Sequence, residues 1–224
     1  MNLKDWWSFY SGIISDFSFD PRLDYLSSLK LSSILSDKST VAPLVRIKGK
    51  KAVVIGNGEN LRSILGSIPV GLRIVADSAL GAFLEAEPCP DIIVTDLDGN
   101  IGKIMSCASQ GSTVVIHSHG DNMREVENLD LVAGGTFVGT TQNIPLWNIF
   151  NFGGFTDGDR AAFLADHFGA DGIILAGFHF DRPNPEKLSD PAVKKKKLKW
   201  ARLLLEHLAG HRGSGFKEGD FIEI

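Results

Sequence analysis

The sequence predicts an α/β protein with a Rossmann-like, doubly wound, mostly parallel sheet and a small helical N-terminal unit. From residue 51 onward, short β-branched apolar runs alternate with stretches of helical periodicity. The apolar runs are continuous, which is typical of parallel strands covered by helices on both faces. Before residue 48 the pattern is helical and then polar. We therefore expect a helical segment at 1–48 and an α/β domain at 49–224.

Two helices are expected within residues 1–36. The first has apolar residues at helical spacing on one face, namely Trp6, Tyr10, Ile13, Ile14 and Phe17. The pair Asp20-Pro21 is a typical helix start, because proline is favoured at the first helical position. Residues 37–50 are polar and contain Pro43, so we expect a linker there.

The remaining elements follow in strict alternation. Strands are expected near 51–55, 72–76, 91–95, 113–117, 135–139 and 172–176. Helices are expected near 59–68, 78–87, 100–109, 121–127 and 157–168. A last helix is expected from about residue 190 to 209, with Asp190 as its cap and Pro191 in its first turn.

The composition of this 224-residue chain is ordinary for a globular protein, with 43% apolar and 22% charged residues. A formal charge of −4 argues against a general nucleic-acid binder, which usually has a basic face. The start of the sequence lacks the apolar region of a signal peptide, and no apolar run approaches the about 20 residues of a membrane helix. We expect a cytoplasmic protein with no nucleic-acid or membrane partner.

The two cysteines, Cys89 and Cys107, show no metal-binding spacing. A disulfide between them stays open, but we expect reduced thiols in an intracellular protein. The oligomeric state is open as well. Trp6 or Trp7 could form the face of a homodimer, although we expect both to pack the N-terminal helices.

The third expected strand ends in Thr95-Asp96-Leu97-Asp98-Gly99. Two aspartates two positions apart can both reach one hard cation from a turn, and Mg²⁺ prefers one or two carboxylates with phosphate oxygens and waters. The alternative is a simple Asx turn with its tip at Asp98-Gly99. We favour a metal site, because Asp77 reaches the same edge from the neighbouring strand and crowded carboxylates repel one another without a cation.

Glycines follow the first expected strand, in Gly56-Asn57-Gly58. They would allow the backbone to approach a phosphate at the following helix start. The sequence lacks both the third glycine of a dinucleotide fingerprint and the lysine of a Walker loop, so a plain strand-to-helix turn is an equal alternative. Asp77 and Ser78, after the second strand, join this loop as candidate nucleotide-binding residues.

The fourth expected strand ends in a cluster of polar residues, His117, His119, Asp121 and Asn122. A zinc site would need a further ligand, and no cysteine pair offers one. We expect the histidines to bind phosphate or substrate, with general acid or base chemistry also open to them. Asp121 joins the metal cluster or caps the next helix, and a structural role for His117 stays open.

Three further segments carry polar residues that an ordinary fold does not require. Thr140, Thr141 and Gln142 could bind the edge of a heterocycle, or form an ordinary polar loop. Thr156 and Asp159 resemble a capping box, which leaves Asp157, Arg160 and the preceding glycine pair as a candidate binding loop. The run Lys194–Lys197 opposes the dipole of the last helix, which indicates an anionic neighbour, although such runs are usually solvated.

The ordered set 76–77, 95–99, 117–122, 140–142 and 154–161 resembles the archaeal 6-hydroxymethyl-7,8-dihydropterin pyrophosphokinase family. The His-Ser-His-Gly-Asp-Asn and Phe-Thr-Asp-Gly-Asp-Arg stretches are its most specific parts. A more distant similarity is to thiamin pyrophosphokinases. The first loop departs from the family, in which glycine is often followed by Pro-Ser. Here Gly58 is followed by Glu59-Asn60, and an acidic residue beside a phosphate loop is unusual.

The resemblance implies an enzyme that uses ATP and Mg²⁺ to transfer pyrophosphate to a hydroxymethyl-dihydropterin and that releases AMP, within archaeal pterin or folate cofactor synthesis. In the resulting hypothesis Asp96 and Asp98 hold Mg²⁺. Asp121 shares the metal or accepts the hydroxyl proton. The other candidates bind the pterin substrate: His117, His119, Asn122, Thr140, Thr141, Gln142, Asp157 and Arg160.

Two other functions fit parts of the sequence. Asp-x-Asp turns on α/β folds also hold metal-bound nucleotide sugars, so a glycosyltransferase-like protein is one rival, although no sugar-binding extension is present. A non-catalytic nucleotide-binding module is the other. The density of carboxylates and histidines at the expected strand ends argues against it.

Overall fold

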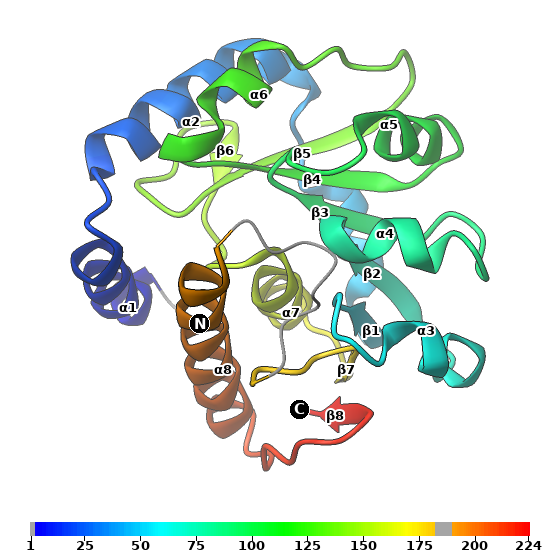
Figure 1. The fold of residues 1–224 in the computed structure, drawn as a ribbon. Coiled ribbons are helices and arrows are strands. Elements are labelled where there is room, and N and C mark those ends of the chain that lie inside the picture. The colour runs from blue at the N-terminus through cyan, green and yellow to red at the C-terminus, as the bar shows by residue number, and fades with distance from the viewer. Residues whose placement is uncertain (1–2, 182–189) are drawn as a thin grey trace.

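The computed structural model describes residues 3–181 and 190–224, and Figure 1 shows their fold. The strands form one sheet with the order β6-β5-β4-β3-β2-β1-β7-β8. Neighbouring strands are parallel except for β8, which pairs antiparallel to β7. Their bounds are β1 (Lys51–Ile55), β2 (Leu72–Ala76), β3 (Ile92–Thr95), β4 (Thr113–Ser118), β5 (Thr136–Thr141), β6 (Ile149–Phe150), β7 (Gly172–Ala176) and β8 (Phe221–Glu223).

Helices precede the sheet and connect its strands. The α-helices are α1 (Leu3–Phe17), α2 (Pro21–Leu35), α3 (Leu61–Ile64), α4 (Asp77–Phe83), α5 (Ile101–Ser109), α6 (Met123–Glu127), α7 (Asp157–His167) and α8 (Pro191–His211). Short 3-10 helices occupy Ser36–Lys38, Ala42–Ile47, Leu65–Ser67 and Gly120–Asn122. The expected caps are confirmed, because Asp20 accepts from the backbone N–H of Arg22 (2.9 Å) and Asp190 accepts from that of Ala192 (2.9 Å).

The sheet is covered on both faces, as its continuous apolar strands predict. Alternate residues of each strand enter different cores, so Val54 belongs to the core that includes residues of α1, α7 and α8, and Val53 belongs to the core that includes residues of α2 to α6. Figure 1 shows these two layers of helices on either side of the sheet. The predicted fold class, a Rossmann-like α/β sheet with N-terminal helices, is confirmed.

The direction in which the chain winds changes once. From β1 the strands are added outward to β6, and β7 then pairs with the other side of β1. This makes the carboxyl ends of β1 and β7 the switch point of the sheet, which is where ligands bind in open α/β folds.

The N-terminal helices are part of the same packed structure. Trp6 and Tyr10 of α1 are buried in the core on one face, and Leu31 and Leu35 of α2 in the core on the other. Burial of Trp6 confirms that it packs the helices rather than forming an exposed face. The division at residue 48 stays a prediction.

Several details differ from the expectation. Strands β6 and β8 were not expected, and the helix expected over 59–68 is only the single turn α3 followed by a 3-10 turn. The expectation of free thiols is wrong, because Cys89 and Cys107 form a disulfide with Cα atoms 5.3 Å apart. The fold brings α5 against the segment before β3, a contact that an 18-residue separation does not reveal. Among the described residues, none of the helices has the length and apolarity needed to span a bilayer.

Candidate active site

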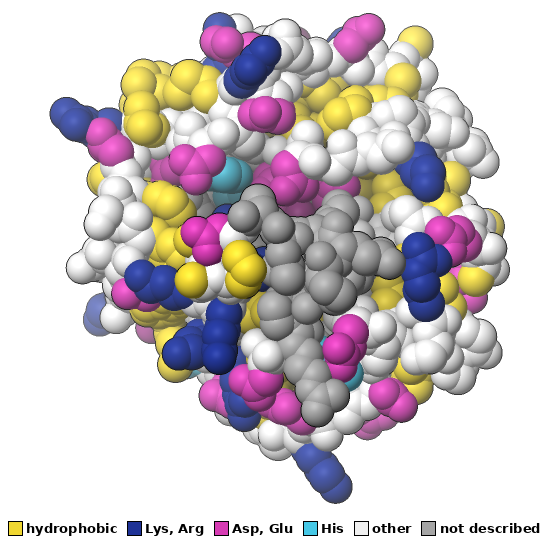
Figure 2. All heavy atoms as spheres, in the orientation of Figure 1, with side chains coloured by type: hydrophobic (Ala, Val, Ile, Leu, Met, Phe, Trp, Pro, Cys, Tyr) yellow, Lys and Arg dark blue, Asp and Glu magenta, His cyan; other side chains and the backbone are white. Residues whose placement is uncertain are grey.

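A cavity of about 200 Å³ lies at the carboxyl edge of the parallel sheet. Figure 2 shows acidic side chains and a histidine gathered in a hollow on this side of the molecule. Most of the expected site residues line the cavity: Gly56, Asn57, Gly58, Ser78, Asp96, Asp98, His117, His119, Asp121, Gln142, Asp157 and Arg160. The strand ends therefore converge as the parallel sheet requires.

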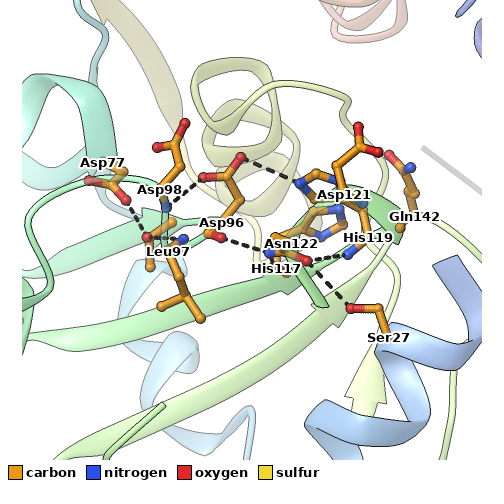
Figure 3. A network of polar contacts seen from close by, with 12 residues as sticks. Ser27, Asp77, Asp96, Leu97, Asp98, His117, His119, Asp121, Asn122 and Gln142 are labelled. Carbon is orange, nitrogen blue, oxygen red and sulfur yellow. Dashed lines mark hydrogen bonds and ion pairs between the residues drawn. The ribbon is translucent and has the colours of Figure 1, made fainter. Parts of the chain in front are cut away.

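Three carboxylates form the acidic cluster of the site, namely those of Asp77, Asp96 and Asp98. Each offers an oxygen, and these oxygens lie within 4.8 Å of one another, so they could hold a metal ion. The hydroxyl of Thr95 donates to the Asp77 carboxylate, and the backbone N–H of Gly99 donates to its Oδ2 (3.2 Å). Figure 3 shows Asp77, Asp96 and Asp98 around the turn that follows β3.

The turn between the two aspartates holds an unusual backbone conformation. Leu97 has a φ of 71°, in the left-handed region that costs energy for a branched residue. Its N–H donates to Oγ1 of Thr95 (2.8 Å), and its side chain is buried, so the conformation is held by its surroundings. This conformation brings Asp96 and Asp98 to the same side of the turn.

Asp96 also faces the histidine of the next loop. Its Oδ2 lies 3.5 Å from Nε2 of His119. Burial acts to raise the pKa of Asp96, but the hydrogen bond and charge of His119, with the bonds from Asp98, hold that pKa below its ordinary value. Asp96 is therefore an anion at neutral pH and can serve as a cation ligand.

Helix α7 contributes a fourth carboxylate and a buried cation. Burial and the charges of Asp96 and Asp77 raise the pKa of Asp157 well above its ordinary value, whereas Arg160 acts to lower it. Arg160 is buried and lines the cavity, and Nη2 donates to the carbonyl of Phe155 (2.9 Å). The expected capping box is present, with Asp159 accepting from the Thr156 hydroxyl (2.8 Å). This box fixes the position of Asp157 in the first turn.

Asn122, Thr140 and Thr141 are buried behind the site rather than among the described residues that line the cavity. The Asn122 amide donates to the carbonyls of Asp96 and His117, both at 2.7 Å, and so ties the two loops together (Figure 3). The Thr140 hydroxyl donates to the carbonyl of Ile116 (3.0 Å), and that of Thr141 accepts from Ser28 (2.7 Å). Their binding of substrate stays a prediction.

His117 lies between these supports and the cavity. Burial, followed by the charges of Arg160 and His119, lowers the pKa of His117 well below its ordinary value, so the ring is neutral. Nδ1 lies 3.3 Å from the Thr140 hydroxyl, and Nε2 has no hydrogen-bond partner among the described residues.

The sequence analysis did not identify the residues of α2 that line the cavity. Asp24 is buried, lines the cavity, and accepts from Tyr10 Oη (2.7 Å), Gln142 Nε2 (2.8 Å) and the backbone N–H of Gly120 (2.7 Å). Phe19 and Leu23 line the cavity beside it. The sequence did offer a signal for Asp24, because it is a carboxylate on the buried face of an amphipathic helix, and buried charges are rare unless they are paired.

Close packing against the end of β7 explains why the first loop has glycines at positions 56 and 58. The N–H of Gly58 donates to the carbonyl of Gly177 (2.7 Å), and a Cβ atom on Gly58 would lie 2.7 Å from that oxygen. A Cβ atom on Gly56 would lie 2.9 Å from the ring of Phe178. The loop thus packs on the end of β7, as the plain-turn alternative requires, while its residues also line the cavity.

Comparison with known proteins decides the family. Residues 29–184 match a family model described as MptE-like, 6-hydroxymethylpterin diphosphokinase MptE-like. The chain belongs to the MptE-like family. The match begins within α2 and includes every strand from β1 to β7.

Archaeal relatives of this MptE-like chain carry the name 6-hydroxymethyl-7,8-dihydropterin pyrophosphokinase. The relative from Methanocaldococcus jannaschii is 37% identical, with 93% of this chain and 96% of the relative covered. The relative from Methanothermobacter thermautotrophicus is 39% identical (93% and 95% covered), and that from Pyrococcus furiosus is 41% identical (93% and 94% covered). The expected family resemblance is confirmed.

Proposed function

We propose that this protein is an enzyme that transfers the pyrophosphate group of ATP to the hydroxymethyl group of 6-hydroxymethyl-7,8-dihydropterin and releases AMP. The observation that carries the proposal is the carboxylate cluster of Asp77, Asp96 and Asp98, of which Asp96 and Asp98 line the cavity. The names of the archaeal relatives support the substrate.

The order of the strands suggests how the two substrates lie. The acidic cluster follows β2 and β3, in the middle of the sheet. On one side of it, the loops after β1 and β7 bring Gly56–Gly58 and Phe178 to the cavity, and we assign this side to the nucleoside of ATP. On the other side, His117, Gln142 and α2 suit the acceptor.

The acceptor side has the groups that a pterin ring needs. An aminopyrimidinone edge presents donors and acceptors that must be paired when buried. Gln142 and the Nε2 atom of His117 can exchange hydrogen bonds with it, while Phe19 and Phe155 provide apolar contact. Asp24 holds the amide of Gln142 in one orientation through the 2.8 Å hydrogen bond.

The acidic cluster fits Mg²⁺, because hard carboxylate oxygens are the ligands this ion prefers. We propose that Asp77, Asp96 and Asp98 hold it. When bound, Mg²⁺ neutralises charge on the phosphate oxygens. Asp77 was expected at the same edge of the sheet and was assigned to nucleotide binding, and its carboxylate lies with the other two.

The reaction requires little covalent chemistry of the protein. The hydroxyl oxygen of the substrate forms a bond to the β-phosphorus, the bond from that phosphorus to the bridging oxygen breaks, and AMP leaves with the electron pair. Asp121 lines the cavity next to His119, and in this proposal it accepts the hydroxyl proton. Arg160 offers a buried positive charge to the developing phosphate charge.

AMP release tests the proposal. The protein would be incubated with ATP and Mg²⁺ and, separately, with the hydroxymethyl-dihydropterin or thiamin. AMP with the pterin alone is the expected result. AMP release with thiamin alone would show that thiamin is the acceptor, and the proposed pyrophosphate transfer would stand. AMP with neither would overturn the proposal, and hydrolysis of a UDP-sugar in a parallel reaction would favour the sugar transferase.

We also propose a cytoplasmic location, where ATP is available, and a role in archaeal pterin or folate cofactor synthesis. A homodimer is proposed through the exposed side chains of Leu29, Ile144 and Trp147, which are 43%, 57% and 70% exposed. Light scattering of the purified protein measures its mass, and a monomer at all concentrations would contradict the dimer.

A further inference from the structure

Two lysines of α8 lie at the site, although α8 begins at Pro191, well after the end of β7 at Ala176. Lys194 and Lys197 both line the cavity and are half-buried. They stand three positions apart, so they share one face of the helix. Within the described part of the chain, neither lysine has an ion-pair partner within 4 Å.

Their neighbours in the same run behave differently. Lys196 pairs with Asp16 (3.0 Å) and its ammonium lies 4.8 Å from the centre of the Phe17 ring. Lys195 is exposed and is not among the residues that line the cavity. The basic run is therefore not one solvated face, because two of its members face the site and two do not.

The charges around the cavity explain why cations are needed there. Asp77, Asp96 and Asp98 lie together, and Asp157 is close enough for their charges to raise its pKa. One divalent cation does not offset the three carboxylates of the acidic cluster and a triphosphate as well. Positive side chains must therefore supply the remaining charge, and one buried arginine is not sufficient.

The two lysines are placed to supply it. Burial and the charge of Lys197 lower the pKa of Lys194, whereas the charges of Asp157, Asp98 and Asp96 act to raise it. Lys194 is thus within electrostatic reach of the acidic cluster. Two half-buried ammonium groups on one helix face repel each other unless an anion lies between them.

We propose that Lys194 and Lys197 bind the β- and γ-phosphates of the nucleotide, which together are the group that is transferred. This inference rests on the proposed function. In the proposed arrangement, the transferred phosphates lie between the acidic cluster and the acceptor, next to the carboxylates whose charges act on Lys194. The nucleoside lies against the loops after β1 and β7. Lysine binds phosphate as a point charge, so no fixed geometry is required of the two side chains.

Binding measurements test the inference without turnover. The probe is α,β-methylene ATP with Mg²⁺, in which the bond that must break is replaced by a stable one, and AMP is the second ligand. Titration calorimetry would compare the unchanged protein with K194A, K197A and the matched control K195A, whose side chain lies outside the cavity. Circular dichroism would establish that each variant is folded.

We expect K194A and K197A each to lose about tenfold to a hundredfold in affinity for α,β-methylene ATP, as for other hydrogen bonds to charged groups. Their affinity for AMP should stay unchanged, as should both affinities of K195A. The inference would be overturned if K194A and K197A lost as much affinity for AMP, if K195A lost as much affinity for α,β-methylene ATP, or if K194A and K197A lost no affinity. These binding results require no pterin, so they stand apart from the AMP-release test of the proposed function.

Discussion

Gly99 lies directly against the carboxylate of Asp77. Its backbone N–H donates to Oδ2 of Asp77 (3.2 Å), and a Cβ atom at position 99 would lie 1.7 Å from Oδ1. The space for this carboxylate in the acidic cluster therefore exists because residue 99 has no side chain.

Gly99→Ala should displace the Asp77 carboxylate and weaken metal binding by about 10–100-fold, the range typical of residues that position ligands. The backbone of Gly99 is not in the left-handed region, so the fold should survive. Calorimetric titration with Mg²⁺ measures the effect. Gly66→Ala is the control, because nothing lies within 4 Å of its Cβ position. Unchanged Mg²⁺ affinity in Gly99→Ala would remove Asp77 from the proposed ligands.

Asp96→Asn should reduce kcat by about 10²–10³-fold while the protein stays folded, because it would remove one of the carboxylates proposed to hold the Mg²⁺ that neutralises phosphate charge. Asp130→Asn is the control, since Asp130 lies on the loop leading into β5, at the opposite edge of the sheet. Steady-state AMP release at saturating Mg²⁺ is the measurement. Near-normal turnover of Asp96→Asn would show that this carboxylate is not needed.

Removal of Mg²⁺ should lower the thermal stability of the protein, because the acidic cluster then repels itself. The Tm should rise with Mg²⁺ concentration in the unchanged protein. In Asp98→Asn this rise should be much smaller, while the Tm in chelator should be higher, by about 2–4 °C for each kcal/mol of repulsion removed. A Tm that is independent of Mg²⁺ in the unchanged protein would contradict a metal site.

Stability should fall as the pH falls below 6.5, the ordinary pKa of histidine. His117 stays neutral in the folded protein because burial lowers its pKa, whereas the unfolded chain binds a proton near pH 6.5. The unfolded state then binds more protons, and this one group contributes a loss of up to about 1.4 kcal/mol per pH unit.

Urea unfolding between about pH 5 and 7.5 measures this dependence. His117→Gln should flatten the curve, and His211→Gln, at an exposed position of α8, should leave it unchanged. If the stability of His117→Gln depends on pH as steeply as that of the unchanged protein, groups other than His117 cause the loss of stability at low pH.

Tyr10→Phe should destabilise the protein by about 1.5–3 kcal/mol, because a hydrogen bond to a buried carboxylate is lost. It should also raise KM for the pterin and leave KM for ATP unchanged, since Asp24 then holds Gln142 less firmly. Tyr25→Phe, on an exposed position of α2, is the matched control. A uniform rise in both KM values would assign Tyr10 to folding alone.

The strands that carry the site were predictable because each is a continuous apolar run followed by unusual polar residues. β6 and β8 were missed because two and three residues are too few to show a pattern. The helix after β1 was predicted too long because its apolar spacing continues into a 3-10 turn, where Leu65 is still buried.

The site was predictable wherever residues follow a strand directly, and not where distant segments meet. Asp24 contacts Gln142 across 118 positions, and no local pattern indicates that contact. The role of Asn122 in joining two loops was not predictable either. Its position in a polar run does not indicate that its amide donates to two backbone carbonyls, and its binding of substrate stays a prediction.

The cavity joins Asp24 of α2 to Lys194 of α8, near opposite ends of the chain. A growing chain can therefore form the early strands of the sheet, but it has no complete site until α8 has been synthesised. Contacts of such long range also form slowly. Substrates consequently stabilise only the finished molecule, and they give no help to the partly made chain while it folds.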